Sequence, residues 1–104
     1  MIRYWSWPIP DKNDGITYGP IGFIRPECKD DKGLLVHEQT HVKQFWQFLR
    51  DFKFRSTEDL EVDAYRAQLE AYGPGHDPIK LAKRLVDNYG FDLTLDLAII
   101  LLTI

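Results

Sequence analysis

The sequence of 104 residues has little cysteine, no cluster of positive charge and no long apolar run. Its single cysteine, Cys28, excludes an intramolecular disulfide, which fits a reducing compartment. The net charge of -3 argues against nucleic acid as a partner, because phosphate binding needs clustered lysine and arginine. No apolar run reaches the roughly 20 residues that cross a bilayer, and the first residues lack the apolar stretch of a signal peptide. We therefore expect a cytoplasmic protein without a membrane span.

The residues that are present predict one small globular domain that covers residues 1–104. The composition is 44% hydrophobic and 28% charged, which a disordered chain does not show. At this length the core is thin, so a bound metal would add useful stability. The segment 93–104 is very apolar but too short for a membrane span, and we expect it in the core or in an interface between copies of the chain.

Glycine and proline divide the first third into extended segments, and the rest shows helical periodicity. Residues 16–24 are rich in β-branched and aromatic side chains, but Gly19 and Pro20 restrict them to short or edge strands. Helices are predicted at about 34–52, 57–72 and 77–89. The segment 91–104 is ambiguous, and we favour a helix capped by Thr94. The predicted fold class is α+β: a small N-terminal antiparallel sheet packed on the first helix, followed by two or three further helices.

The most informative stretch is VHEQTH, residues 36–41, in the first predicted helix. Two histidines four residues apart on one helix face can bind the same zinc ion. A glutamate directly after the first histidine can deprotonate a zinc-bound water and later protonate a leaving amine. This is the H-E-x-x-H signature of zinc metallopeptidases. The motif therefore predicts His37 and His41 as metal ligands and Glu38 as the catalytic base.

A helical wheel tests whether this helix is an ordinary amphipathic one. Its apolar arc contains Leu34, Leu35, Val42, Phe45, Trp46, Phe48, Leu49 and Phe52. Its polar arc contains Gln39, Thr40, Lys43, Gln44, Gln47, Arg50 and Asp51. Glu38 falls near the middle of the apolar arc, His41 lies within it and His37 lies at its border. A carboxylate there is costly unless it is paired, coordinated or neutral, so a metal site is favoured over a satisfied buried polar cluster.

Two candidates for a third metal ligand are weak. Gln44 and Gln47 stand where the extended metzincin motif needs a glycine and a histidine, which excludes that class of peptidase. Cys28 lies only nine residues before His37, and its surroundings do not match the cysteine segment of peptide deformylases. We interpret Cys28 as a loop cysteine without a role in the site.

The third candidate, Glu61, lies on the second predicted helix. A wheel of that helix places Glu61 and Gln68 within its broad buried arc, whereas Asp63 points to water. The alanines of the same helix allow a close approach to the first helix. Glu61 could therefore complete a His₂Glu set with an open fourth position, which is a catalytic arrangement. An ion pair with a lysine or arginine is the alternative use of Glu61.

The two motifs together resemble those of the gluzincin zinc peptidases, the thermolysin-like group. HEQTH at residues 37–41 matches the first motif, and LEVDAYRAQ at residues 60–68 matches the second. The small size resembles the single-domain members called minigluzincins and phage metallopeptidase domains. The resemblance implies one Zn²⁺ ion bound by His37, His41 and Glu61, and peptide-bond hydrolysis with Glu38 as general base.

The resemblance also has implications for the substrate and for the oxyanion. A peptide or protein substrate would pair by β-augmentation with an edge strand near Ile21–Ile24. The chain is too short for the second subdomain in which thermolysin carries an oxyanion-stabilising histidine. Tyr65, one turn after Glu61, is our substitute as a catalytic hydrogen-bond donor, with a packing role as the alternative. His76 is predicted to be a surface residue near the start of the third helix.

Two other functions stay open from the sequence. Zinc could stabilise a binding or interaction protein that has no turnover. The chain could also be a latent peptidase whose apolar tail, residues 93–104, docks across the cleft. The same tail could join two copies into a homo-oligomer. A preference for zinc does not exclude other metals, because His₂Glu sites bind several divalent ions.

Overall fold

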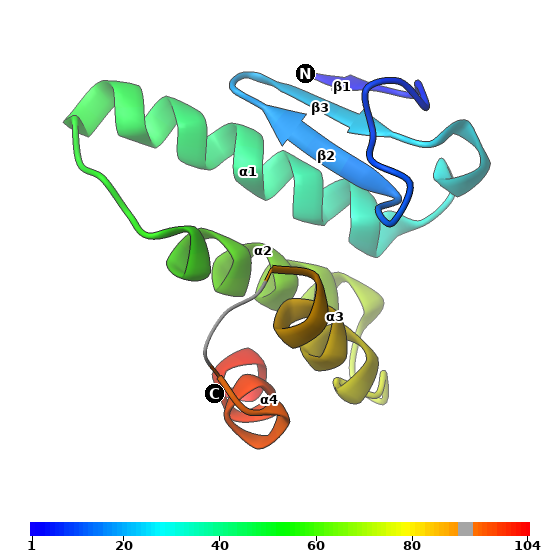
Figure 1. Cartoon of the computed structure of the whole chain (residues 1–104), viewed down its shortest axis with the longest axis vertical. Helices are drawn as coiled ribbons and strands as arrows, with labels where there is room; N and C mark the ends of the chain where they lie inside the picture. The colour runs from blue at the N-terminus through cyan, green and yellow to red at the C-terminus, as the bar shows by residue number, and fades with distance from the viewer. Residues whose placement is uncertain (90–92) are drawn as a thin grey trace.

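A computed structural model describes residues 1–89 and 93–104 and shows an α+β fold, with a sheet on one side of a long helix and three further helices on the other (Figure 1). The strands are β1 (Ile2–Arg3), β2 (Gly15–Tyr18) and β3 (Ile21–Ile24). The helices are α1 (Lys32–Asp51), α2 (Thr57–Tyr72), α3 (Ile79–Tyr89) and α4 (Leu95–Thr103), and a 3₁₀ turn, η1, covers Pro26–Cys28. The predicted fold class is confirmed.

The sheet differs from the prediction in the identity of its edges. β2 and β3 form an antiparallel hairpin, as expected, but β1 pairs in parallel with the other side of β3. The backbone N–H of Gly22 donates to Met1 O at 2.8 Å in this pairing. Ile21–Ile24 is therefore the central strand, and the prediction that it forms the substrate-binding edge was wrong. A two-residue strand has no periodicity by which the sequence could reveal it.

One face of the sheet packs against α1, and glycine makes the approach close. Because side chains alternate along a strand, Gly15 and Thr17 of β2 face the helix together with Gly22 of β3. A Cβ atom on Gly22 would lie 3.3 Å from Glu38 Cβ and 2.7 Å from the Ile2 side chain. The sheet can therefore lie directly over Glu38 because this position has no side chain.

Side chains cap the first turns of α1 and α4, and α1 begins at Lys32, slightly before the start predicted near residue 34. The Asp31 side chain accepts a hydrogen bond from Leu34 N at 3.0 Å at the start of α1. Thr94 caps α4 in the same way, which confirms the helix favoured for the last segment, although residues 91 and 92 of that segment lie outside the described part. α1 and α2 then run antiparallel (Figure 1). They meet closely at Gly33, where a Cβ atom would lie 2.3 Å from the Tyr72 ring.

The main apolar core lies on the side of α2 that faces away from the sheet. It contains Tyr65, Leu81, Ala82, Leu85, Ala98 and Leu102. α4 contributes to this core and packs against α2 and α3 (Figure 1), so the tail does not lie across the cleft as the latent form would require. Leu97, Ile100 and Ile104 remain exposed on its outer side, and self-association through this face stays a prediction. No helix in the described residues is long and apolar enough to span a bilayer.

Candidate metal centre

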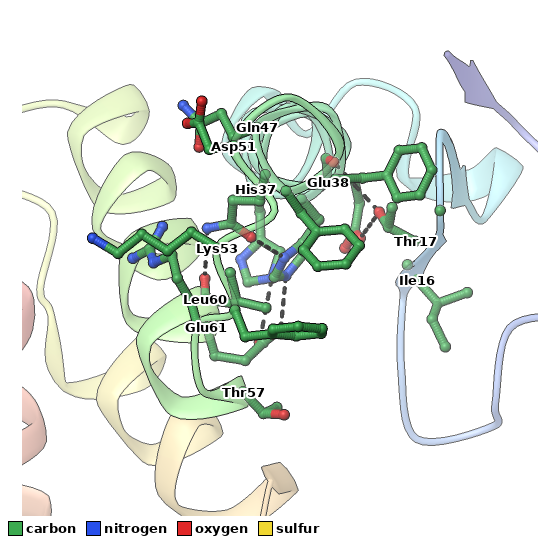
Figure 2. Close-up of a pocket in the computed structure, with 18 of the residues that line it drawn as sticks. Ile16, Thr17, His37, Glu38, Gln47, Asp51, Lys53, Thr57, Leu60 and Glu61 are labelled. Atoms are coloured by element: carbon green, nitrogen blue, oxygen red, sulfur yellow. Dashed lines mark hydrogen bonds and ion pairs between the residues drawn. The ribbon is translucent and has the colours of Figure 1, made fainter.

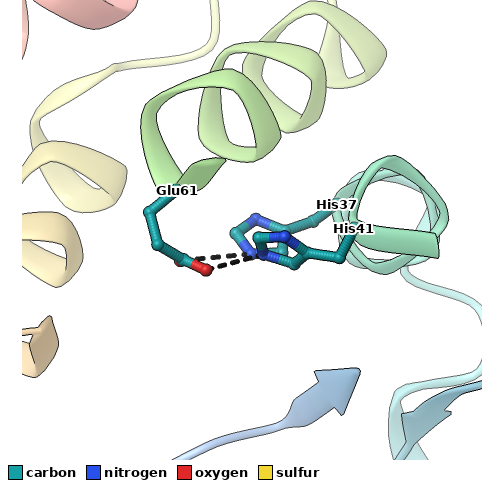
Figure 3. Close-up of side chains that lie close together, drawn as sticks. All are labelled: His37, His41 and Glu61. Carbon is teal, nitrogen blue, oxygen red and sulfur yellow. Dashed lines mark ion pairs between the residues drawn. The ribbon is translucent and has the colours of Figure 1, made fainter. Parts of the chain in front are cut away.

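His37, His41 and Glu61 come together between α1 and α2, as the two wheels predicted (Figure 3). Nε2 of His41 lies 2.7 Å from Glu61 Oε1, and Nε2 of His37 lies 3.7 Å from Glu61 Oε2. One potential ligand atom from each residue lies within 4.8 Å of the others. The three side chains are largely buried, so their cluster could hold a metal ion away from bulk solvent.

Gln44 fixes the ring of His41. Its Oε1 lies 2.9 Å from His41 Nδ1, and its Nε2 donates to the backbone oxygen of Leu60 at 3.1 Å. Since a carbonyl oxygen can only accept, the amide nitrogen of Gln44 must face Leu60 and the amide oxygen must face the imidazole. His41 therefore carries a proton on Nδ1 and directs Nε2 toward Glu61.

Gln68 fixes the ring of His37 through a longer chain of hydrogen bonds. Tyr72 donates its hydroxyl proton to Asp31 Oδ1 at 2.5 Å, so its oxygen is left to accept from Gln68 Nε2 at 3.1 Å. The amide oxygen of Gln68 then accepts from His37 Nδ1 at 2.9 Å. The direction of each bond follows from the previous one, because the Asp31 carboxylate can only accept. His37 therefore also directs Nε2 toward Glu61.

The donor atoms of this cluster fit a cation. Both Nδ1–H groups donate to amide oxygens, so the two Nε2 atoms face the Glu61 carboxylate. Only a proton or a metal ion can lie favourably between these nitrogen atoms and the carboxylate. Among the described residues, no hydrogen-bond donor satisfies the buried oxygen Glu61 Oε2. Burial would raise the pKa of Glu61, but the two histidines lower it to about 2. Two imidazoles and one ionised carboxylate form a donor set that suits a divalent metal.

Glu38 lies beside this cluster on the side of the sheet. It is only 3% exposed, and its Oε1 accepts a hydrogen bond from Thr17 Oγ1 of β2 at 2.8 Å. A Cβ atom on Gly15 would lie 2.9 Å from Glu38 Oε2, so β2 comes this near because residue 15 is glycine. Burial raises the pKa of Glu38, although the nearby His37 and the bond from Thr17 oppose the shift.

An open cleft of about 600 Å³ runs past the three residues of the cluster and Glu38. Figure 2 shows Ile16 and Thr17 of β2 on one side of the cleft and Thr57, Leu60 and Glu61 of α2 on the other. The C-terminal half of α1 and the connection to α2 extend this wall with three phenylalanines, Phe45, Phe48 and Phe54. A segment of polypeptide could therefore enter from solvent and reach the cluster.

Tyr65, Cys28 and His76, the other residues that the sequence analysis considered, do not line the cleft. Tyr65 is 3% exposed, and its ring packs 4.4 Å from the ring of His37, next to a small cavity behind that histidine. Its role as an oxyanion donor stays a prediction, and the contact with His37 agrees with the alternative packing role. Cys28 lies in η1, outside the cluster. His76 is exposed, as predicted, and its ring lies 4.4 Å from that of Tyr72.

The sequence did not reveal the hydrogen-bond partners of the two histidines. Gln44 was placed on the solvent-facing arc of α1, but it is 8% exposed because α2 covers that side of the helix at Leu60. Gln68 was correctly placed on the buried arc of α2, yet its partner was not apparent. The signal that could have identified it is an amide side chain on an apolar face, which needs a polar partner.

Comparisons with protein-family models, with curated proteins and with solved structures find no match for this chain. The geometry of the cluster, of the cleft and of the strand beside them is therefore the basis for a function of this chain.

Proposed function

We propose that this chain is a zinc-dependent metallopeptidase of the gluzincin type, with His37, His41 and Glu61 as zinc ligands and Glu38 as general base. The observation that carries the proposal is the position of Glu38. It is buried beside a ligand histidine, it borders the cleft, and it is bonded to the strand that forms the cleft wall. A purely structural metal site has no use for a carboxylate held in this way.

The choice of zinc rests on the donor set. Two imidazole nitrogens and one carboxylate are typical of catalytic zinc sites, which keep one position open. Within the described residues the cluster contains three such groups, and the cleft gives access to it. A zinc ion bound there would polarise a carbonyl group and lower the pKa of a water molecule.

Glu38 has the geometry of a proton carrier. Thr17 donates to Oε1, so this oxygen is held in place, while Oε2 lies toward Gly15 at the cleft. The carboxylate can take a proton from water at Oε2 and pass it to the leaving nitrogen of the peptide. Its burial excludes bulk water, which would otherwise compete for the same proton.

The substrate would pair with β2, the edge strand that lines the cleft. Arg25 N donates to Asp14 O at 2.9 Å, so residues 14 and 25 form a hydrogen-bonded pair of the hairpin. Since such pairs alternate along antiparallel strands, the backbone groups of Gly15 and Thr17 point away from β3. A peptide lying along β2 could bond to these groups and bring a carbonyl to the cluster by β-augmentation.

Glu38→Gln tests the proposed mechanism, because glutamine keeps the shape of the side chain but cannot accept the proton. We expect the variant to bind zinc like the wild type and to lose about 10²–10⁴-fold in the rate of peptide hydrolysis. Glu70→Gln, at an exposed position on α2, is the matched control and should keep full activity.

The non-catalytic alternative predicts a different pattern. A wild-type chain that binds zinc but cleaves no member of a mixed peptide library would favour a zinc-stabilised binding protein. Equal hydrolysis by wild type and Glu38→Gln would contradict the assigned base.

A further inference from the structure

Both ligand histidines are held by glutamines, and each glutamine forms one bond as an acceptor and one as a donor. Gln44 accepts from His41 and donates to Leu60 O. Gln68 accepts from His37 and donates to Tyr72. A glutamate could provide the acceptor for the imidazole but not the second donor, and a leucine could provide neither. The two amide positions therefore require glutamine for a chemical reason.

The bonds from Gln68 continue to the start of α1. Tyr72 bonds to Asp31, and the same oxygen of Asp31 accepts the N-cap bond from Leu34 N. The ring of Tyr72 is held at this place by contact with Gly33. Metal ligand and helix cap are thus joined by four consecutive hydrogen bonds through side chains that come from both helices.

We propose that Gln44 and Gln68 are positioning residues that fix each imidazole with Nε2 toward the metal, and that the Gln68–Tyr72–Asp31 chain couples metal binding to the N-terminal cap of α1. The inference rests on the metal site of the proposed function, but it does not depend on peptidase activity. Coupling between two equilibria is reciprocal. Loss of the hydrogen bonds of Tyr72 must therefore weaken metal binding by the same factor by which bound metal strengthens those hydrogen bonds.

Gln68→Glu and Gln44→Glu test the need for an amide. Each variant keeps an acceptor for the imidazole but loses the amide donor. At position 44 the new carboxylate oxygen faces Leu60 O, which cannot donate. At position 68 it faces the Tyr72 hydroxyl group, whose single proton already goes to Asp31. We expect zinc affinity, measured by competition with a chromophoric chelator, to fall about 10–100-fold in each. Gln39→Glu, an exposed glutamine of α1, makes the same chemical change as a control and should bind zinc like the wild type.

Unchanged or tighter zinc binding by the glutamate variants would contradict the need for an amide. If the imidazole needed only an acceptor, a carboxylate would strengthen the ligand, and Gln68→Glu would bind zinc as tightly as the wild type or more tightly. That outcome would overturn the proposal. Circular dichroism of the zinc-free variants separates a loss of affinity from a loss of fold.

Tyr72→Phe tests the coupling to the helix cap, since it keeps the ring beside Gly33 and removes only the hydroxyl group. We expect zinc affinity to fall about tenfold, at the lower end of the effect of such partners. The rise in melting temperature that zinc causes should shrink accordingly. Tyr18→Phe, an exposed tyrosine on the outer face of the sheet, is the control.

Unchanged affinity and an unchanged zinc-induced shift in melting temperature in Tyr72→Phe would contradict the coupling.

Different results would contradict the positioning role of the glutamines and the proposed peptidase activity. A wild-type chain that binds zinc normally, with the expected losses in the variants, but hydrolyses no peptide would contradict only the peptidase. A wild-type chain that binds no zinc would remove the basis of both.

Discussion

Glu38 and Glu61 are both buried, yet their surroundings suit them to different tasks. Glu61 faces two histidines, which lower its pKa to about 2, so it stays ionised and can bind a cation. Burial raises the pKa of Glu38, whose direct partner is the hydroxyl group of Thr17. A carboxyl group of this second kind takes up a proton more readily than Glu61 does. The opposite directions of the two pKa shifts follow from the neighbours of each carboxylate.

Thr17→Val should reduce turnover without removing the metal. The change deletes the hydrogen bond to Glu38 Oε1, and a bond to a charged group contributes about 1.5–3 kcal/mol. We therefore expect kcat to fall about tenfold or more, with little change in zinc affinity. Thr17→Ser restores the hydroxyl group and should recover most of the rate. Steady-state kinetics of the three proteins would show this, and an unchanged kcat in Thr17→Val would contradict the role of the bond.

At the residue scale the sequence predicted the cluster itself but not its support. A carboxylate on an apolar arc has few satisfactory solutions, so Glu38 and Glu61 could be identified as buried and as candidates for a site. The partners of Gln44 and Gln68 depend on the distance between α1 and α2, which no local pattern encodes. Thr17 gave no signal either, because threonine is ordinary in a strand.

At the scale of elements, α1 packs against two partners at once. The sheet covers Glu38 and α2 covers Gln44, so the buried surface near the middle of α1 is wider than its apolar arc. The C-terminal end of α1 projects beyond the sheet (Figure 1). Trp46 and Phe52, which the wheel placed on the apolar arc, are there 55% and 79% exposed. A wheel describes one helix and cannot show where its partners begin and end.

Gly33→Ala should loosen the contact between α1 and α2. A Cβ atom there would lie 2.3 Å from the Tyr72 ring, so the ring or the helix must move. Overpacking of this kind costs about 1–3 kcal/mol, which urea denaturation of the two proteins can measure. In a Tyr72→Ala background the same change should be close to neutral, because the space is then free. An equal loss in both backgrounds would contradict the contact.

At the scale of the whole molecule, α4 completes the apolar core that packs behind the candidate metal centre. Ala98 and Leu102 of α4 pack in one cluster with Tyr65, which in turn contacts His37. The apolar composition of the tail predicted its burial, but the choice between core, cleft and partner needed the position of α2 and α3. The tail thus stabilises the domain and leaves the cleft open.

Leu102→Ala should destabilise the protein and not activate it. The side chain is 4% exposed, and a buried leucine replaced by alanine costs about 2–5 kcal/mol. Thermal unfolding should show this loss, whereas Ile104→Ala, at a 74% exposed position, should change little. A gain in peptide hydrolysis by Leu102→Ala at a temperature where it is folded would instead support a blocking tail.

The central claim is that α1 and α2 together form one metal site, and the zinc content of Glu61→Ala tests it most directly. We predict about one zinc ion per wild-type chain, measured by metal analysis after dialysis against a weak chelator. Glu61→Ala should lose most of this zinc, and Glu70→Ala, on the exposed side of the same helix, should keep it. Equal zinc content in wild type and Glu61→Ala would contradict the three-ligand site.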